Sequence, residues 1–320
     1  MRIGLWIDDD QQSVDELRRR LHTAAEAGFG ALWLSERGGW DPLTLLAAAG
    51  PVPSGVPVGT SIVRTYPRHP LALAAQVLTA QAATGNRLVL GLGPGPQPII
   101  AGQYGYDPAR PVENLREYLG VLLPLLRGEQ VAHEGPAWHA AGAIAVSGVP
   151  APPVYLSALG PRMLQLTGEV ADGTLTTWTG PRTVTEHVLP RLSRAAAEAG
   201  RPVPAVTAGV CIGLTKDVDS LRTWVHEAFG AAVGLPSYRA AFDREGVAGP
   251  ADMVLAGDET TLEREINRFA AAGVAELQII PCGTADEQDR TIAFAAELST
   301  RPASGSASGD GSDPQGPRGA

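Results

Sequence analysis

The first 34 residues, MRIGLWIDDDQQSVDELRRRLHTAAEAGFGALWL, decide the fold of this chain. Residues 3–7 have the apolar spacing of a short strand, and residues 13–16 (SVDE) form a capping box, which marks the start of a helix. Gly28 ends that helix, and residues 31–34 (ALWL) are a continuous apolar run, typical of a strand covered on both faces. The stretch therefore predicts a strand–helix–strand unit of the kind that builds parallel sheets.

The same alternation continues along the chain to about residue 280. Apolar runs that predict strands lie at residues 3–7, 31–34, 57–62, 87–92, 154–157, 173–177, 205–214 and 277–280. Helices are expected between them at residues 42–49, 70–83, 111–126 (with a kink or an end near Pro124), 161–170, 182–199, 218–246 and 261–272. Eight strands separated by helices favour a closed (β/α)8 barrel, the TIM-barrel fold, over a doubly wound open sheet. Residues 127–150, irregular or forming a small hairpin, and the helical segment 218–257 are expected insertions in that barrel.

Length and composition are those of an ordinary globular protein. The chain has 320 residues, of which 44% are hydrophobic and 18% charged. Residues 1–300 are assigned to one barrel domain. Residues 301–320 contain mostly Gly, Ser, Pro and Asp with almost no apolar side chains, so we expect a disordered C-terminal tail there.

Charge and cysteine content exclude several classes of protein. A net charge of −9 argues against a nucleic-acid binder. Two distant cysteines, Cys211 and Cys282, exclude a disulfide scaffold and fit a cytoplasmic protein. Three acids within the first ten residues argue against a signal peptide, and prolines interrupt the uncharged stretch 135–161, so no membrane partner is expected. His133 and His139 lack a metal-binding pattern, and we expect no metal.

Two segments that follow predicted strands have the composition of ligand-binding loops, because barrel active sites lie at the C-terminal ends of the strands. Residues 157–162 (SALGPR) end a strand and start a helix, whose free N–H groups would bind an anion or simply begin an ordinary helix. The glycines of residues 91–95 either form a tight loop or let a ligand approach closely. They do not form a dinucleotide fingerprint, because the third required glycine is Pro96.

Five motifs, taken in order, resemble the bacterial luciferase-like monooxygenase family, and most closely its branch that uses the deazaflavin coenzyme F420. The resemblance covers about residues 1–300. The motifs are residues 58–62 (VGTSI), 68–76 (RHPLALAAQ), 85–93 (GNRLVLGLG), 153–161 (PVYLSALGP) and 168–173 (GEVADG).

The resemblance implies a flavin-like ring at the C-terminal ends of the strands, supported by a non-prolyl cis peptide between Ser61 and Ile62. It also implies that the turn after the fifth strand holds the cofactor phosphate, with Arg64 and Arg68 as partners for an anionic tail or as solvated loop arginines. The cofactor-binding residues that it implies are Thr60, Ser61, Ile62, Arg64, Gly91, Gly93, Ser157, Ala158, Leu159, Gly160, Pro161 and Arg162.

The sequence departs from the family at the expected proton donor. Many relatives have an acid–His pair after the second strand, where this chain has Glu36 and Arg37, and some have an acid at the position of Pro96. Glu36 is the first candidate for the catalytic proton donor, although a structural ion pair with Arg37 would also explain it. The alternatives are Tyr66, His69, Asp8 and a bound water. The tryptophans expected to line the substrate pocket, unless they belong to the core, are Trp6, Trp40 and Trp178.

The resemblance predicts an F420-dependent oxidoreductase, in which the reduced coenzyme transfers a hydride to a C=C or C=N bond of a small organic substrate. One alternative is an FMN-dependent monooxygenase or reductase on the same barrel. Another, of a different class, is a cofactor-binding barrel without catalysis. The resemblance also suggests a homodimer.

Overall fold

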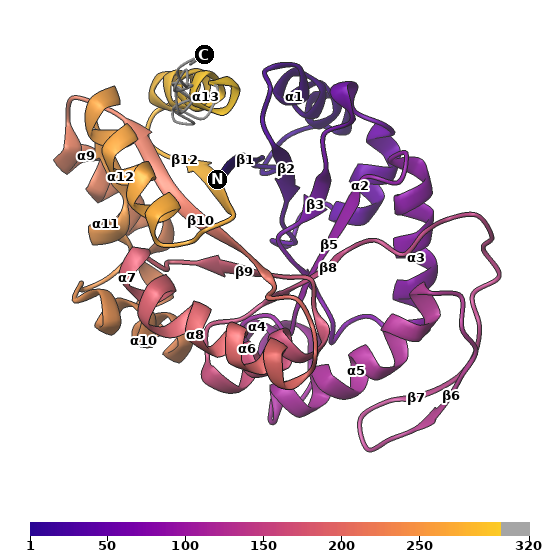
Figure 1. Ribbon diagram of the computed structural model, residues 1–320. Coiled ribbons are helices and arrows are strands. Elements are labelled where there is room, and N and C mark those ends of the chain that lie inside the picture. Colours follow the sequence, from indigo (N-terminus) through magenta and orange to yellow (C-terminus); the bar gives the residue numbers. More distant parts are fainter. Residues whose placement is uncertain (302–320) are drawn as a thin grey trace, which may run out of the picture.

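Eight parallel strands close into a barrel in the computed structural model, which describes residues 1–301 (Figure 1). The last barrel strand pairs with the first, with Leu277 opposite Ile3, so no edge of the barrel is left open. The predicted TIM-barrel fold is confirmed. The barrel strands, in spatial order, are β1 (Arg2–Trp6), β2 (Ala31–Leu34), β3 (Val58–Thr60), β5 (Leu88–Gly93), β8 (Val154–Ser157), β9 (Gly173–Thr177), β10 (Ala205–Leu214) and β12 (Glu276–Pro281).

Helices form a ring outside the strands (Figure 1). Many begin at residues that favour helix starts: Ser13 caps the first helix by accepting from the backbone N–H of Glu16, and Asp41 caps the second in the same way. The helices are α1 (Val14–Glu26), α2 (Pro42–Ala49), α3 (Pro70–Ala83), α4 (Gln97–Tyr104), α5 (Pro111–Leu126), α6 (Pro161–Val170), α7 (Pro181–Thr183), α8 (Leu189–Glu198), α9 (Val218–Phe229), α10 (Pro236–Glu245), α11 (Pro250–Met253), α12 (Glu259–Ala271) and α13 (Ala285–Thr300).

Several boundaries differ from the sequence-based expectations. The single helix expected over 218–246 is two helices, separated by a 3-10 turn over Gly230–Gly234, where two glycines and Pro236 interrupt the helical pattern. Segment 184–188 between α7 and α8 is a single π turn. Helix α5 continues past Pro124 to Leu126 instead of ending there.

Other elements were not expected from the sequence at all. Regular secondary structure continues past the last barrel strand, because helix α13 follows β12. Helix α4 and the short strands β4 (Val63–Arg64) and β11 (Leu255–Gly257) lie in segments expected to be loops or helix.

The expected hairpin is present as β6 (Val131–Glu134) and β7 (His139–Gly142). The tail prediction falls on residues 302–320, outside the described residues. No helix within residues 1–301 is both long and apolar enough to cross a membrane.

Large side chains fill the lumen of the barrel. Trp33 and Tyr155 are buried there with ring centroids 6.3 Å apart, packed with Leu175. Glycines make room for them: a Cβ on Gly59 would lie 2.6 Å from the Trp33 ring, and one on Gly4 would lie 3.1 Å from its Nε1. The lumen is therefore a packed core, and a ligand can be held only above it, at the C-terminal ends of the strands.

The carboxyl group of Glu276, the first residue of β12, lies inside the barrel against Trp33. Trp33 Nε1 donates to Glu276 Oε1 at 2.6 Å, and Arg2 Nη2 lies 3.0 Å from Oε2. The Glu276 side chain is 1% exposed, whereas Arg2 is 53% exposed. Burial raises the pKa of Glu276, and the charge of Arg2 and the Trp33 hydrogen bond offset only part of this rise. Ionised Glu276 therefore opposes folding.

We expect Glu276→Gln to change how stability depends on pH. Because the folded pKa of Glu276 lies above its unfolded value, the stability that it contributes is complete below the unfolded pKa and declines as pH rises through the folded pKa. Gln keeps an acceptor for Trp33 and has no charge, so the variant should gain stability relative to the wild type as pH rises from about 4 through the folded pKa of Glu276. Urea unfolding across this range measures the difference. Glu26→Gln, an exposed acid on α1, is the control, and a parallel pH dependence of wild type and Glu276→Gln would contradict the prediction.

Candidate active site

A chain of hydrogen bonds joins four strands at the C-terminal mouth of the barrel. Trp6 Nε1 donates to Ser35 Oγ at 2.7 Å, and Ser35 Oγ donates to the carbonyl of Ser61 at 2.5 Å. Ser61 Oγ in turn donates to Gln278 Oε1 on β12 at 3.1 Å. The peptide bond between Ser61 and Ile62 is cis, as the family resemblance implied. These contacts fix the backbone at the position where the ring of a cofactor is expected.

Gly91 and Gly93 are required by the packing of the protein itself. A Cβ on Gly91 would lie 1.8 Å from the carbonyl oxygen of Thr60, and one on Gly93 would lie 2.1 Å from Ser157 Oγ. Thr60 Oγ1 bridges to the N–H and the carbonyl of Gly91, each at 2.9 Å. Close approach of a ligand is therefore not needed to explain these two glycines, and their part in cofactor binding stays a prediction.

The turn before α6 has the properties of an anion site. Gly160 is the N-cap and no side chain caps the helix, while Pro161 occupies the first turn. A Cβ built on Gly160 would meet no atom within 4 Å, so the space in front of the helix is open to a ligand. Ala158 is buried, and the Leu159 carbonyl accepts from His187 at 2.8 Å, which holds the turn in place. A phosphate group fits this end of the helix.

Arg162 does not complete that site. Its side chain is 68% exposed and forms an ion pair with Glu113 on α5. This contact directs its charge toward α5, so we expect the backbone N–H groups at the start of α6, and not Arg162, to make the main anion contacts.

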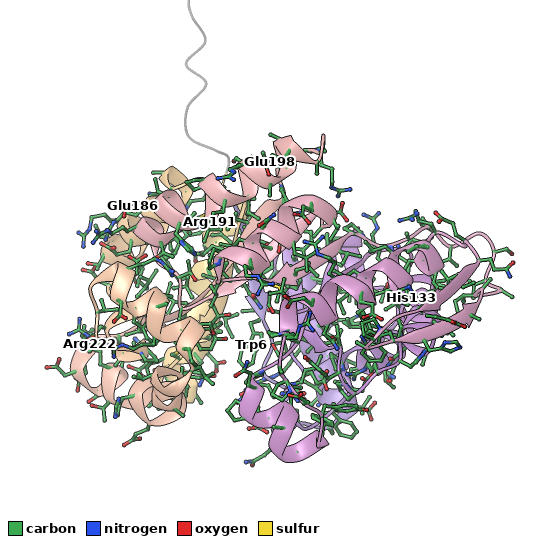
Figure 2. The ribbon with its side chains drawn as sticks, turned by 90° about the horizontal axis from the view of Figure 1, so that it is seen from below. Trp6, His133, Glu186, Arg191, Glu198 and Arg222 are labelled. Carbon is green, nitrogen blue, oxygen red and sulfur yellow. The ribbon has the colours of Figure 1, made fainter. Side chains whose placement is uncertain are left out.

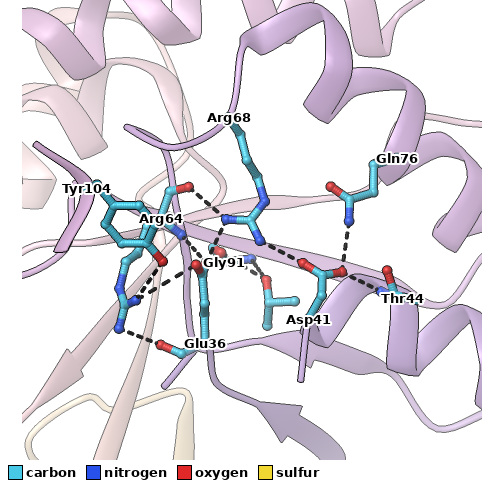
Figure 3. Close-up of polar contacts among 9 residues, drawn as sticks. Glu36, Asp41, Thr44, Arg64, Arg68, Gln76, Gly91 and Tyr104 are labelled. Atoms are coloured by element: carbon cyan, nitrogen blue, oxygen red, sulfur yellow. Dashed lines mark hydrogen bonds and ion pairs between the residues drawn. The ribbon is translucent and has the colours of Figure 1, made fainter. Parts of the chain in front are cut away.

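Glu36 lies in a buried network of ion pairs (Figure 3). Its side chain is 9% exposed, and Oε2 accepts from Arg68 Nη1 and from the backbone N–H of Arg64, each at 2.8 Å. Arg64 also donates to the Glu36 carbonyl at 2.8 Å, and Arg68 Nη2 donates to Asp41 at 2.6 Å. All these contacts use Glu36 as an acceptor, which favours a positioning role. The expected partner Arg37 is not among them.

The charge on Arg68 is fixed by this network. Burial by itself would lower the pKa of Arg68, but Glu36 and Asp41 more than offset this and raise its pKa above the usual value. The Arg64 side chain is 6% exposed and the Arg68 side chain 17%. Both arginines are therefore committed to internal acids, which does not support the expectation that they bind a cofactor tail.

Asp9, which was not among the expected proton donors, has the environment of one. It follows β1 and is 6% exposed, and no other residue within 1–301 forms a hydrogen bond or ion pair with its carboxyl group. A Cβ on Gly39 would lie 3.9 Å from Asp9 Oδ2, so the group faces the segment that follows β2. Burial raises the pKa of Asp9; a hydrogen bond from its own backbone N–H and the charge of Arg37 offset part of the rise, and the charges of Asp8 and Asp10 add to it. A carboxyl with a raised pKa at a barrel mouth is a candidate general acid.

The other candidate donors have different surroundings. His69 caps α3, with its Nδ1 accepting from Leu71 at 3.2 Å, and its Nε2 lies 2.8 Å from the His139 carbonyl. Tyr66 is 4% exposed with an unpaired hydroxyl, and burial raises its pKa, so it stays an alternative. The contacts of His69 are those of a helix cap.

The three tryptophans do not share one environment. Figure 2 shows Trp6 in the gap between the helices of the first half of the chain and those of the second half. Trp178 is 6% exposed and packs against Phe229 and Phe242, in the core beneath the helical insertion. Trp40 is 43% exposed and donates to the Gln12 carbonyl at 3.0 Å. Trp6 is thus the tryptophan that we place at the mouth, while roles for Trp40 and Trp178 stay predictions.

Comparison with known proteins shows the family. The profile described as luciferase-like monooxygenase matches residues 1–293. The chain belongs to this family. A 5,10-methylenetetrahydromethanopterin reductase of Methanopyrus kandleri is 30% identical over 239 residues, covering 68% of this chain and 66% of the relative. An F420-dependent glucose-6-phosphate dehydrogenase of Nakamurella multipartita is 28% identical over 283 residues, covering 84% and 82%.

A solved structure shares the luciferase-like fold. The oxygenating constituent of 3,6-diketocamphane monooxygenase from Pseudomonas putida, in complex with FMN, superposes with a TM-score of 0.75 at 18% identity. The superposition covers 94% of this chain and 97% of that one. At this identity the similarity supports the fold and not the cofactor.

Within the luciferase-like fold, Arg37 occupies the place where the resemblance implied a histidine. Its guanidinium lies 5.2 Å from the centre of the Trp6 ring and its Nη1 is 2.9 Å from Asp8 Oδ1. An arginine stays charged at all working pH values and cannot deliver the proton that a histidine would. Asp8 is paired with Arg37, which leaves Asp9 as the buried one of the three aspartates, with no ion pair to any residue of 1–301.

Proposed function

We propose that this protein is a coenzyme F420-dependent oxidoreductase, which reduces a C=C or C=N bond of a small organic substrate. The observation that carries the proposal is the uncapped start of α6, open in front of Gly160 at the mouth of the barrel. The F420-dependent dehydrogenase that aligns over 84% of this chain supports the choice of coenzyme.

The residues at the mouth divide into three roles. The N–H groups of the first turn of α6 would bind the coenzyme phosphate. The bonded series Trp6–Ser35–Ser61–Gln278 would position the ring above the packed lumen. The bound coenzyme supplies the hydride. Asp9 would hold the proton that the substrate receives, and burial raises its pKa, so it keeps that proton to a higher pH than an exposed aspartate does.

The second candidate is an FMN-dependent monooxygenase or reductase. It stays open because a protein that shares this fold, the Pseudomonas putida enzyme, was solved in complex with FMN. The two coenzymes differ in chemistry, because a reduced flavin reacts readily with dioxygen and a reduced deazaflavin does not. Both classes share this fold, so the fold does not show which coenzyme the protein uses. A measurement of coenzyme binding is needed to decide.

Fluorescence titration of the purified protein with F420 and, separately, with FMN tests the proposal. We expect saturable binding of F420, weaker binding of FMN, and return of the visible absorbance of oxidised F420 when α,β-unsaturated ketones or cyclic imines are added to the reduced complex. Tight retention of FMN with no affinity for F420 would overturn the coenzyme assignment. Binding of F420 without turnover of any such compound would favour the non-catalytic barrel.

We further propose that the protein works as a cytoplasmic homodimer on a small-molecule substrate. Light scattering of the purified protein tests the oligomeric state, and a single chain in solution would overturn this part.

A further inference from the structure

Helix α4 follows β5 at the mouth of the barrel and has few contacts with the rest of the protein. Of its eight residues only Ile100 is buried, and no other helix or strand of the described chain packs extensively against it. Residues 97–106 (QPIIAGQYGY) contain no charged side chain, so they form no ion pair. Within residues 1–301, the side-chain hydrogen bond that joins α4 to another element runs from Arg64 Nη1 to the Tyr104 hydroxyl at 3.5 Å, which is long for such a bond (Figure 3). Ile100 is therefore the main attachment of α4 to the barrel.

The sequence of α4 also makes the helix weak by itself. An isolated helix of this length is not stable in water, so α4 depends on its packing. Gly102 in its interior lowers helix stability further, and a Cβ built there would meet no atom within 4 Å, so no close contact requires this glycine. Gly95 before the helix and Gly105 after it have φ angles of 81° and 71°, which glycine adopts readily. A weakly packed helix between two such glycines opens more easily than its neighbours.

The attached end of α4 lies beside the place where the coenzyme ring is expected. A Cβ on Gly93, the last residue of β5, would lie 3.3 Å from Ile62 Cδ1, and Ile62 belongs to the cis peptide. Two residues later, a Cβ on Gly95 would lie 3.1 Å from Arg64 Cγ and 3.2 Å from Ile100 Cδ1. The attachment of α4 is thus next to the expected ring, and a movement of the helix changes access to that ring.

Exposed aromatic side chains gather on the segments around the mouth. Within residues 1–301, the large aromatic side chains that are exposed are Trp40, Tyr104 and Tyr106, and each of them lies on a segment that follows a barrel strand. Tyr104 is 38% exposed and Tyr106 is 44% exposed. The Tyr106 ring lies 6.1 Å from the ring of buried Tyr66, so it rests on the loop that follows β4. Covering such rings with an apolar ligand is favourable, because it removes their faces from water.

We propose that α4 closes over the occupied mouth and that Tyr104 and Tyr106 then bind the substrate through a flat, uncharged ring system. Aromatic rings pack on such a surface, whereas a charged group would be buried without a partner, because residues 97–106 carry no charge. The inference rests on the proposed function for the reaction and adds the substrate class, an α,β-unsaturated ketone or cyclic imine that carries aromatic or fused rings. Closure of α4 would also exclude water from the coenzyme ring.

Hydrogen exchange of the coenzyme-free protein tests the mobility of α4. We expect the backbone amides of residues 97–106 to exchange faster than those of α3 and α5, which each have a buried face. Gly102→Ala should slow this exchange by about fivefold, because it stabilises the helix without a clash. Gly120→Ala, the same change inside α5 and also without a neighbour within 4 Å, is the matched control and should leave residues 97–106 unaffected. Protection of α4 equal to that of α3 and α5 would overturn the proposal.

The same measurement with coenzyme tests closure. F420 at saturation should slow the exchange of residues 97–106 by about tenfold, and a ring-bearing unsaturated ketone added with it should slow the exchange further. If F420 does not bind, the proposed function fails, and FMN, the coenzyme of the second candidate, should slow the exchange instead. If neither coenzyme changes the exchange of this segment, α4 does not close over the site.

Two double variants test the contact with the substrate. Tyr104→Ala/Tyr106→Ala should raise KM by about tenfold for ring-bearing substrates and by less than about twofold for open-chain unsaturated ketones, with little change in kcat. Tyr104→Phe/Tyr106→Phe keeps both rings and should restore most of the affinity. Equal changes of KM in the two double variants, or equal changes for ring-bearing and open-chain substrates, would rule out the ring contact and leave the proposed reaction standing.

Discussion

Asp9→Asn is expected to lower kcat by about a hundredfold while leaving F420 binding within twofold of the wild type. Asn has nearly the shape of Asp and removes the proton that a carboxylic acid donates. Because the variant does not alter the start of α6, coenzyme affinity should be unaffected. Steady-state oxidation of reduced F420 by an α,β-unsaturated ketone or cyclic imine that the wild type turns over measures kcat, and fluorescence titration measures the affinity.

The pH profile gives Asp9 a signature that a structural role would not produce. A general acid must be protonated, so kcat should fall as pH rises through the pKa of Asp9, which burial holds above the usual value of an aspartate. This limb should disappear in Asp9→Asn. Asp10→Asn, an exposed neighbour, is the control. A full loss of activity in Asp8→Asn with normal activity in Asp9→Asn would move the role to Asp8.

The contrast between these three aspartates shows what the sequence could not supply. They are consecutive and chemically identical, and the expected alternatives to Glu36 as proton donor included Asp8 but not Asp9. In the folded chain Asp8 forms an ion pair with Arg37, Asp10 is exposed, and Asp9 is buried. Which of them faces inward depends on how the chain leaves β1, and no pattern of polar and apolar residues records that direction.

The ion-pair partners of Glu36 also could not be predicted from the sequence, because they are distant from it along the chain. The nearest cation in sequence, Arg37, suggested an ion pair of neighbours. The actual partners are 28 and 32 positions away, because β2 and β3 pair in parallel register with Leu34 opposite Thr60, which brings the segments after both strands together. Strand pairing in a barrel could be anticipated, but its effect on individual side chains could not.

The barrel itself was predictable because its signals are local. Capping residues, glycine stops and short apolar runs each specify one element, and their alternation specifies the architecture. Even the missed helix α13 had such a signal: Thr284 and Glu287 form a capping box like the one at residues 13–16.

Glu36→Ala is expected to lower the free energy of unfolding by about 3–5 kcal/mol, because it leaves Arg64 and Arg68 buried without their shared acid. Urea unfolding of the coenzyme-free protein measures this loss. Glu16→Ala removes a half-buried surface acid that pairs with Arg19 and should cost no more than about 1 kcal/mol.

Activity separates a positioning role for Glu36 from the alternative that it donates the proton. If Glu36 positions the loops after β2 and β3, the less disruptive Glu36→Gln should lose stability and keep the pH profile of the wild type, because Asp9 still supplies the proton. If Glu36 were the donor, Glu36→Gln would remove the limb that falls at high pH, and Asp9→Asn would retain it. Since the Glu36 carboxylate accepts from Arg64 and Arg68 and donates to no group in the described chain, we expect the first result.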